Sequence, residues 1–150
     1  MALHHSWPAV AETTTLARRA VVDFAEQAGA TGEELEAVQL AVSEAVTNAV
    51  VHAYRDRDTG LVHVSAAVAG DELWVLVADD GCGLSPRDDS PGAGYGLRLI
   101  AQAADQLTVV RRGDGGTELQ MRFNLEHAGR DAGSSPEIST QERRSAAGAC

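Results

Sequence analysis

The chain has 150 residues, which suits one domain, and 44% of them are apolar, enough for a hydrophobic core. Acidic residues outnumber basic residues by 22 to 12, so the formal net charge is −10. This acidity argues against direct nucleic-acid binding, which needs a basic surface. No apolar run reaches the roughly 18 residues of a membrane span, and residues 1–10 lack the pattern of a signal peptide. We therefore expect a cytoplasmic protein that does not enter a membrane.

The first predicted elements are two helices. Residues 13–28 have apolar side chains at helical spacing, and Gly29 is placed to end that helix. Thr31, with Glu34 three residues later, forms the pattern of a capping box. We expect the second helix to run from there to about residue 52.

Two predicted hairpins follow, separated by a loop and a third helix. Residues 61–69 and 73–78 form strands around a Gly-Asp turn, and residues 106–111 and 117–124 form strands around a glycine-rich turn. Between the hairpins lie a loop at 79–93 and a helix at 94–104. The order predicts an α+β fold: a two-layer sandwich whose mixed, mainly antiparallel sheet is covered by helices on one face.

The two ends of the chain are expected to lie outside the folded domain. Residues 1–8 are interpreted as an N-terminal extension, with His4 and His5 in an unstructured segment. The domain is expected to span residues 9–126. Residues 127–150 contain few large apolar side chains, which predicts a disordered tail. Cys82 and Cys150 are too few and too poorly placed to indicate a structural disulfide.

A polar stripe on the second helix is the first candidate for a functional site. Glu44, Asn48 and His52 are spaced four residues apart, and each such step turns only about 40° around a helix. The stripe is either an ordinary solvated helix edge or the lining of a pocket between helix and sheet. A carboxylate there can act as a general base, and an amide oxygen is a suitable Mg²⁺ ligand.

Two glycine-rich segments and one threonine complete the set of candidates. Asp79 directly follows an apolar strand and precedes Gly81 and Gly83, where it can accept a hydrogen bond from an exocyclic amine such as that of adenine. The glycines at 92, 94 and 96 open the third helix, whose N-terminus can attract phosphate. Thr117 begins the last strand after Gly116. Each signal alone is also typical of a turn or a strand.

Taken in order, ExxxNxxxH, DxGxG, GxGxG and GT resemble the GHKL ATPase superfamily with its Bergerat ATP-binding fold. The wording LAVSEAVTNAVVHAY resembles the anti-sigma-factor serine/threonine kinases within it. The resemblance covers residues 9–125. It implies an ATP-binding anti-sigma factor that phosphorylates a serine of an anti-anti-sigma partner, binds a sigma factor and works as a homodimer. The cofactors it implies are ATP and Mg²⁺.

The resemblance also implies roles for individual residues. Glu44 would be the catalytic base, and Asn48 would hold Mg²⁺. The residues that would bind the nucleotide are Asn48, His52, Asp79, Gly81, Gly83, Gly92, Gly94, Gly96, Leu97 and Thr117. Residues 80–91 would form a short lid, with Arg55 and Arg98 as candidates for additional positive charge.

Two other functions remain open at this point. One is a non-catalytic ATP-binding module that sequesters a partner protein, in which Glu44 would not be essential. The other is the ATP-binding part of a sensor histidine kinase. The sequence favours this less, because His4 and His5 are not part of a helical pattern.

Overall fold

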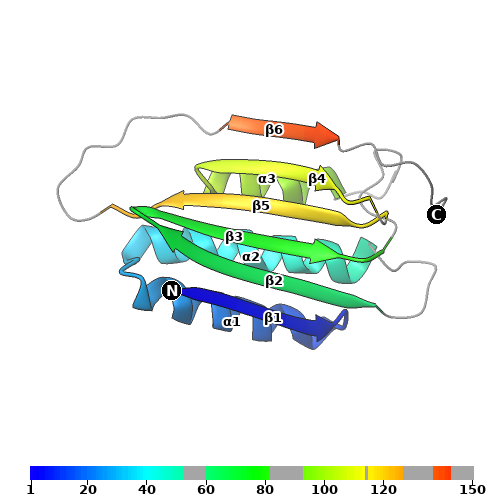
Figure 1. The fold of residues 1–150 in the computed structure, drawn as a ribbon, viewed down its shortest axis with the longest axis horizontal. Coiled ribbons are helices and arrows are strands. Elements are labelled where there is room, and N and C mark those ends of the chain that lie inside the picture. The colour runs from blue at the N-terminus through cyan, green and yellow to red at the C-terminus, as the bar shows by residue number, and fades with distance from the viewer. Residues whose placement is uncertain (53–59, 82–92, 114, 127–136, 143–150) are drawn as a thin grey trace.

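The computed structural model describes residues 1–52, 60–81, 93–113, 115–126 and 137–142. Three helices, α1 (Ala11–Gln27), α2 (Gly32–His52) and α3 (Ala93–Ala103), lie on one face of a sheet (Figure 1). The strands of the sheet are β1 (Ala2–Pro8), β2 (Leu61–Ala69), β3 (Glu72–Asp79), β4 (Gln106–Arg111), β5 (Thr117–Asn124) and β6 (Glu137–Glu142). Their spatial order is β1-β2-β3-β5-β4-β6. All pairs are antiparallel except β4 with β6, so the predicted mixed, mainly antiparallel sheet under one helical layer is confirmed.

The predicted signals at the helix ends are present in the structure. Gly29 has φ +100°, a left-handed conformation that glycine adopts at low cost, and it follows the last turn of α1. The Thr31 backbone N–H donates to the Glu34 carboxylate at 2.8 Å, which is one half of the expected capping box. These two features fix the turn from α1 to α2, and the two helices pack against each other.

The core lies between the helical layer and the sheet. Alternate strand residues face the helices and are fully or almost fully buried, including Val64, Val75, Val77 and Met121. Helix α2 contributes Val38, Val42 and Val46 to the same core. None of the three described helices lies on the other face of the sheet, which is called the open face below (Figure 1). Successive side chains along a strand therefore alternate, one pointing toward the helices and the next toward this open face.

The expectation of an unstructured N-terminal extension was wrong. Residues 2–8 form β1, which pairs along its length with β2. Leu3 and Trp7 pack against the core, and the ring of His5 stacks on that of Trp7 with centroids 5.0 Å apart. His4 instead lies on the open face, where Nδ1 is 2.7 Å from Ser65 Oγ. Packing of these two side chains and pairing with β2 along the whole strand make β1 part of the sheet.

The segment expected to be a disordered tail also contains a strand. The backbone of β6 pairs in parallel with the outer edge of β4. An edge strand presents unpaired N–H and C=O groups, so it can recruit a segment through backbone hydrogen bonds even when that segment is poor in apolar residues. The remainder of the expected tail lies outside the described residues. No helix within the described ranges is both long and apolar enough to cross a membrane.

Candidate functional site

The polar stripe of α2 meets the first turn of α3. A Cβ built on Gly96 would lie 3.2 Å from both Asn48 Oδ1 and Glu44 Oε2, which is tighter than nine in ten real Cβ contacts. Glycine at this position therefore allows the start of α3 to approach a carboxylate and an amide closely. Of the three predicted stripe residues, Glu44 and Asn48 are brought together here. His52 is the last residue of α2, and its side chain lies outside the described residues.

The Asn48 side chain is buried, with 7% of its surface exposed. Its Nδ2 atom is fully buried and, within the described parts of the chain, has no hydrogen-bond partner. Leaving a buried polar group without a partner costs free energy, so such groups are rare and are often found where a ligand binds. The assignment of O and N in the amide follows from its surroundings, and a flip would leave the oxygen as the unpaired atom. Either way, the amide has bonding capacity left for another molecule.

Asp79 is the last residue of β3 and faces the helical layer. Only 6% of its surface is exposed. Its carboxylate accepts the N–H of Gly81 at 3.0 Å and the backbone N–H of Thr117. Burial raises the pKa of Asp79 to about 6, although the two backbone hydrogen bonds oppose this rise. A carboxylate that accepts two backbone donors still has free lone pairs for a ligand amine.

Thr117 and Gly116 hold the end of β3 from the neighbouring strand. Thr117 is buried, and its backbone N–H donates to the Asp79 carboxylate. A Cβ on Gly116 would lie 2.0 Å from the Asp79 carbonyl oxygen, so no larger residue fits there. Gly81, Asp79 and Thr117 thus form a compact second group of predicted residues.

The two groups lie at the same end of the molecule. The carboxyl ends of α2 and β3 point the same way in Figure 1, and α2 packs against both β3 and α3. Leu97 is half-buried and packs against the core beside this end. Gly94 lies in the first turn of α3. The predicted residues Gly83 and Gly92 fall outside the described residues, as do Arg55 and residues 82–91 of the expected lid, while Arg98 is exposed on α3.

Several polar residues near Asp79 were not expected to take part. Asp80 contacts His63 and Arg112 on the open face of the sheet, at 2.7 and 2.8 Å. Burial raises the pKa of Asp80, but the hydrogen bond from His63 and the charges of His63 and Arg112 outweigh it and hold that pKa below its usual value. Period-two alternation after β3 could have placed Asp80 on this face, but no local pattern indicates its partners.

The arrangement suits a nucleotide with a metal ion. A buried acceptor at Asp79 suits an exocyclic amine, and the unpaired amide of Asn48 beside a carboxylate suits a hydrated cation. Among the described residues, no cluster of three or more His, Cys, Asp or Glu side chains could hold a metal ion by itself. Mg²⁺ commonly takes one or two protein ligands and completes its shell with phosphate and water, so Asn48 and a nucleotide would fit it.

Comparison with known proteins agrees with this geometry. Residues 7–123 match the model of the histidine kinase-like ATPase domain. The chain is 32% identical over 125 residues to the anti-sigma F factor of Clostridium novyi, covering 76% of this chain and 87% of that protein. It is 28% identical over 131 residues to the anti-sigma F factor of Oceanobacillus iheyensis, covering 80% and 90%. The chain belongs to the histidine kinase-like ATPase family.

Two solved structures are similar as well. The first contains the RsbU and RsbW domains of a Mycobacterium tuberculosis protein, with a TM-score of 0.68 and 24% identity. It covers 89% of this chain, but this chain spans only 35% of it, and at this identity it shows the fold alone. The second is the histidine kinase domain of a blue-light activated kinase from Erythrobacter litoralis, with a TM-score of 0.53 and 35% identity over 62% of this chain and 45% of that one.

Proposed function

We propose that the protein is an ATP-dependent anti-sigma factor that binds a sigma factor and phosphorylates a serine of an anti-anti-sigma protein. The observation that carries the proposal is the convergence of Glu44 and Asn48 on Gly96 at the start of α3. The similarity to anti-sigma F factors supports the regulatory role. We further propose that it acts in the cytoplasm as a homodimer, and that it does not contact nucleic acid directly, in keeping with its net charge of −10.

In this proposal Asp79 accepts the adenine amine, and Gly81 and Thr117 hold the carboxylate in place through their backbone N–H groups. The amide of Asn48 holds Mg²⁺, which when bound neutralises phosphate charge. The N-terminal turn of α3 offers free N–H groups and a positive dipole end to the phosphates. The remaining nucleotide contacts are assigned in this proposal to the predicted residues His52, Gly83, Gly92, Gly94 and Leu97.

Glu44 is the proposed general base. It is half-buried beside Asn48, where it can accept the proton of a serine hydroxyl. Phosphoryl transfer depends mostly on positioning and charge neutralisation, and removal of a general base typically lowers the rate about 10²- to 10⁴-fold. Binding of ATP should depend much less on Glu44 than on Asp79 or Asn48.

The test is transfer of ³²P from ATP to a purified anti-anti-sigma protein from the same organism. We expect the wild type to label the protein, and Glu44→Gln to bind ATP with similar affinity but label it at least about 100-fold more slowly. A partner whose acceptor serine is replaced by alanine is the control for the site of labelling. Equal transfer by Glu44→Gln would contradict the catalytic assignment. ATP binding without transfer by the wild type would favour the non-catalytic ATP-binding module.

A further inference from the structure

On the open face of the sheet, the side chains of Ser6, His63, Asp80 and Arg112 form a chain of polar contacts. This chain reaches the backbone of Asp79, whose own side chain lies on the opposite face. Asp80 follows Asp79, so its side chain points to the opposite face. Its Oδ2 is 2.7 Å from His63 Nε2 on β2, and its Oδ1 is 2.8 Å from Arg112 Nη1. Because an ionised carboxylate only accepts, His63 Nε2 donates to Asp80, and the other ring nitrogen, Nδ1, is hydrogen-bonded to Ser6 Oγ on β1 at 2.8 Å. Both oxygens of Asp80 are thus held from separate segments of the chain.

Arg112 contacts the main chain of Asp79 as well. The same Nη1 atom that binds Asp80 donates to the Asp79 carbonyl oxygen at 3.2 Å. The Arg112 backbone N–H donates to Gly116 O at 2.8 Å, and Gly116 is the residue that packs directly against this carbonyl. The turn between β4 and β5 therefore contacts the end of β3 in two ways: the Arg112 side chain donates to the Asp79 carbonyl oxygen, and the backbone of Gly116 packs against that oxygen.

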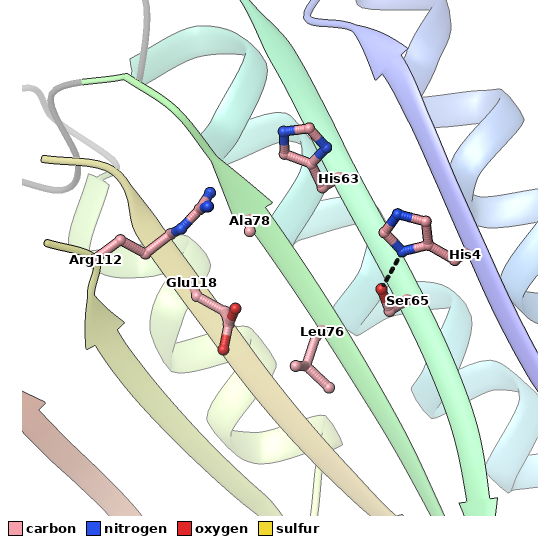
Figure 2. Close-up of a pocket in the computed structure, with 7 residues that line it drawn as sticks. All are labelled: His4, His63, Ser65, Leu76, Ala78, Arg112 and Glu118. Carbon is pink, nitrogen blue, oxygen red and sulfur yellow. Dashed lines mark hydrogen bonds between the residues drawn. The ribbon is translucent and has the colours of Figure 1, made fainter. Parts of the chain in front are cut away.

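The contacts of Asp80 with Arg112 and His63 are expected to contribute little to the free energy of folding. The side chains of Asp80 and Arg112 are 41% and 32% exposed, and ion pairs this accessible to water contribute little to folding. Arg112 and His63 line a pocket of about 270 Å³ together with Leu76, Ala78 and Glu118, and Figure 2 shows the side chains of these residues. The contacts are better explained by what they fix, which is the peptide that carries the Asp79 carboxylate.

We propose that Arg112 and His63, acting through Asp80, are positioning residues that orient the Asp79 carboxylate and so set the preference for a purine with a 6-amino group. This inference rests on the proposed function, because it assigns Asp79 to the adenine. Arg112 and His63 do not touch the nucleotide. Without them the end of β3 can rotate or shift, and a small displacement of the carboxylate weakens its hydrogen bond to the amine while the remaining nucleotide contacts stay.

The test compares two nucleotides by titration calorimetry: Mg-ATP, and Mg-purine riboside triphosphate, which lacks the 6-amino group. We expect Arg112→Ala to weaken ATP binding about tenfold, the size expected for a hydrogen bond to a charged group, and to change binding of the analogue less than about twofold. Asp80→Asn, which keeps the side-chain volume, should act in the same direction. His63→Ala should give a smaller loss, because Arg112 still holds Asp80.

Arg122→Ala is the matched control. Arg122 lies on the same sheet and pairs with Glu72 at 3.1 Å with similar exposure, but it lies near the other end of β5. We expect the Arg122→Ala variant to prefer ATP over the analogue as strongly as the wild type does. In the Asp79→Asn background, Arg112→Ala should cause no further loss of preference, because both changes act on one hydrogen bond.

The outcomes separate the two hypotheses. A wild-type protein that binds neither nucleotide, or binds both equally, would overturn the adenine role of Asp79 and thus the proposed function. If the wild type prefers ATP but Arg112→Ala and Asp80→Asn keep that preference, only the positioning role is wrong. Equal weakening of both nucleotides, or full additivity with Asp79→Asn, would likewise show that Arg112 is merely structural.

Discussion

Gly96 lies so close to Asn48 that one added carbon atom would come within 3.2 Å of the Asn48 amide oxygen and within 3.4 Å of its nitrogen. This contact joins α3 to the polar stripe of α2. It leaves the amide buried, with its nitrogen unpaired among the described residues, next to a helix N-terminus.

Gly96→Ala should impair nucleotide binding more than folding. The added methyl group would push Asn48 and Glu44 aside by a few tenths of an ångström, while Ala gains up to about 1 kcal/mol over Gly within a helix. We expect the free energy of unfolding to change by less than about 1 kcal/mol, and Mg-ATP affinity to fall more than about tenfold. Denaturant unfolding and calorimetry measure the two quantities. Unchanged affinity would show that this contact lies outside the site.

Gly116→Ala should damage the fold itself. Its Cβ would meet the Asp79 carbonyl oxygen at 2.0 Å, and because both atoms belong to the backbone, no change of rotamer can relieve the clash. We expect a loss of about 2 kcal/mol or more in the free energy of unfolding. Gly70→Asn is the control, since Gly70 has open space and a φ of +61° that Asn tolerates. Similar losses in both variants would contradict the packing argument.

Asn48→Ala should abolish the effect of Mg²⁺ with little cost to the unliganded protein. The substitution creates a small cavity but also removes a buried polar atom that lacks a partner, and these two effects oppose each other. Thermal-shift assays with ATP, with and without Mg²⁺, give the readout. The exposed Gln102 on α3 supplies the control variant Gln102→Ala. A large loss of stability without ligand would mean that Asn48 is a structural residue instead.

Asp79→Asn should stabilise the unliganded protein above neutral pH. The folded pKa of about 6 lies above the ordinary value of 3.8 for an Asp side chain, so folding favours the protonated carboxyl. The resulting stabilisation is present below pH 3.8 and is lost as the pH rises through about 6. At pH 8 we expect Asp79→Asn to gain about 2 kcal/mol, with the gain shrinking as the pH falls from 6 toward 4. Asp23→Asn, at an exposed position of α1, is the control for replacing an aspartate by an asparagine.

ATP affinity should also follow the ionisation of Asp79. Protonation turns one oxygen of Asp79 into an O–H donor and removes the negative charge, so the carboxyl accepts the adenine amine less well. The affinity for ATP should therefore weaken as the pH falls below about 6. The γ-phosphate of ATP titrates in a similar range, and Asp79→Asn corrects for this contribution. A pH profile that is identical in wild type and Asp79→Asn would contradict the role given to Asp79.

The elements that could be predicted from the sequence are those marked by signals within a few neighbouring residues. The Thr31–Glu34 cap, the Gly29 stop and the four-residue spacing of Glu44 and Asn48 are all encoded within a few residues of each other, so they can be identified without knowing the fold. The hairpin turn at Gly70, with its positive φ, belongs to the same class. The helix and sheet layers followed from the order of these elements.

Features that depend on distant partners could not be predicted. Strand β1 has only two large apolar side chains, Leu3 and Trp7, and only their packing and the pairing with β2 reveal it as part of the sheet. Strand β6 depends on the free edge of β4 in the same way. The contact between Arg112 and Asp79 joins residues 33 positions apart, and an Arg in a turn carries no signal of its target.

The central claim is that a nucleotide binds between α2, the start of α3 and the end of β3. A ¹H–¹⁵N NMR titration with Mg-ATP tests it most directly, because the Asn48 side-chain amide and the backbone amides of Gly81, Gly96 and Thr117 each give their own signal. We expect these signals to shift together and saturably, while those of His4 and Ser65 on the open face stay in place. Shifts confined to the open face, or none at all, would contradict the account.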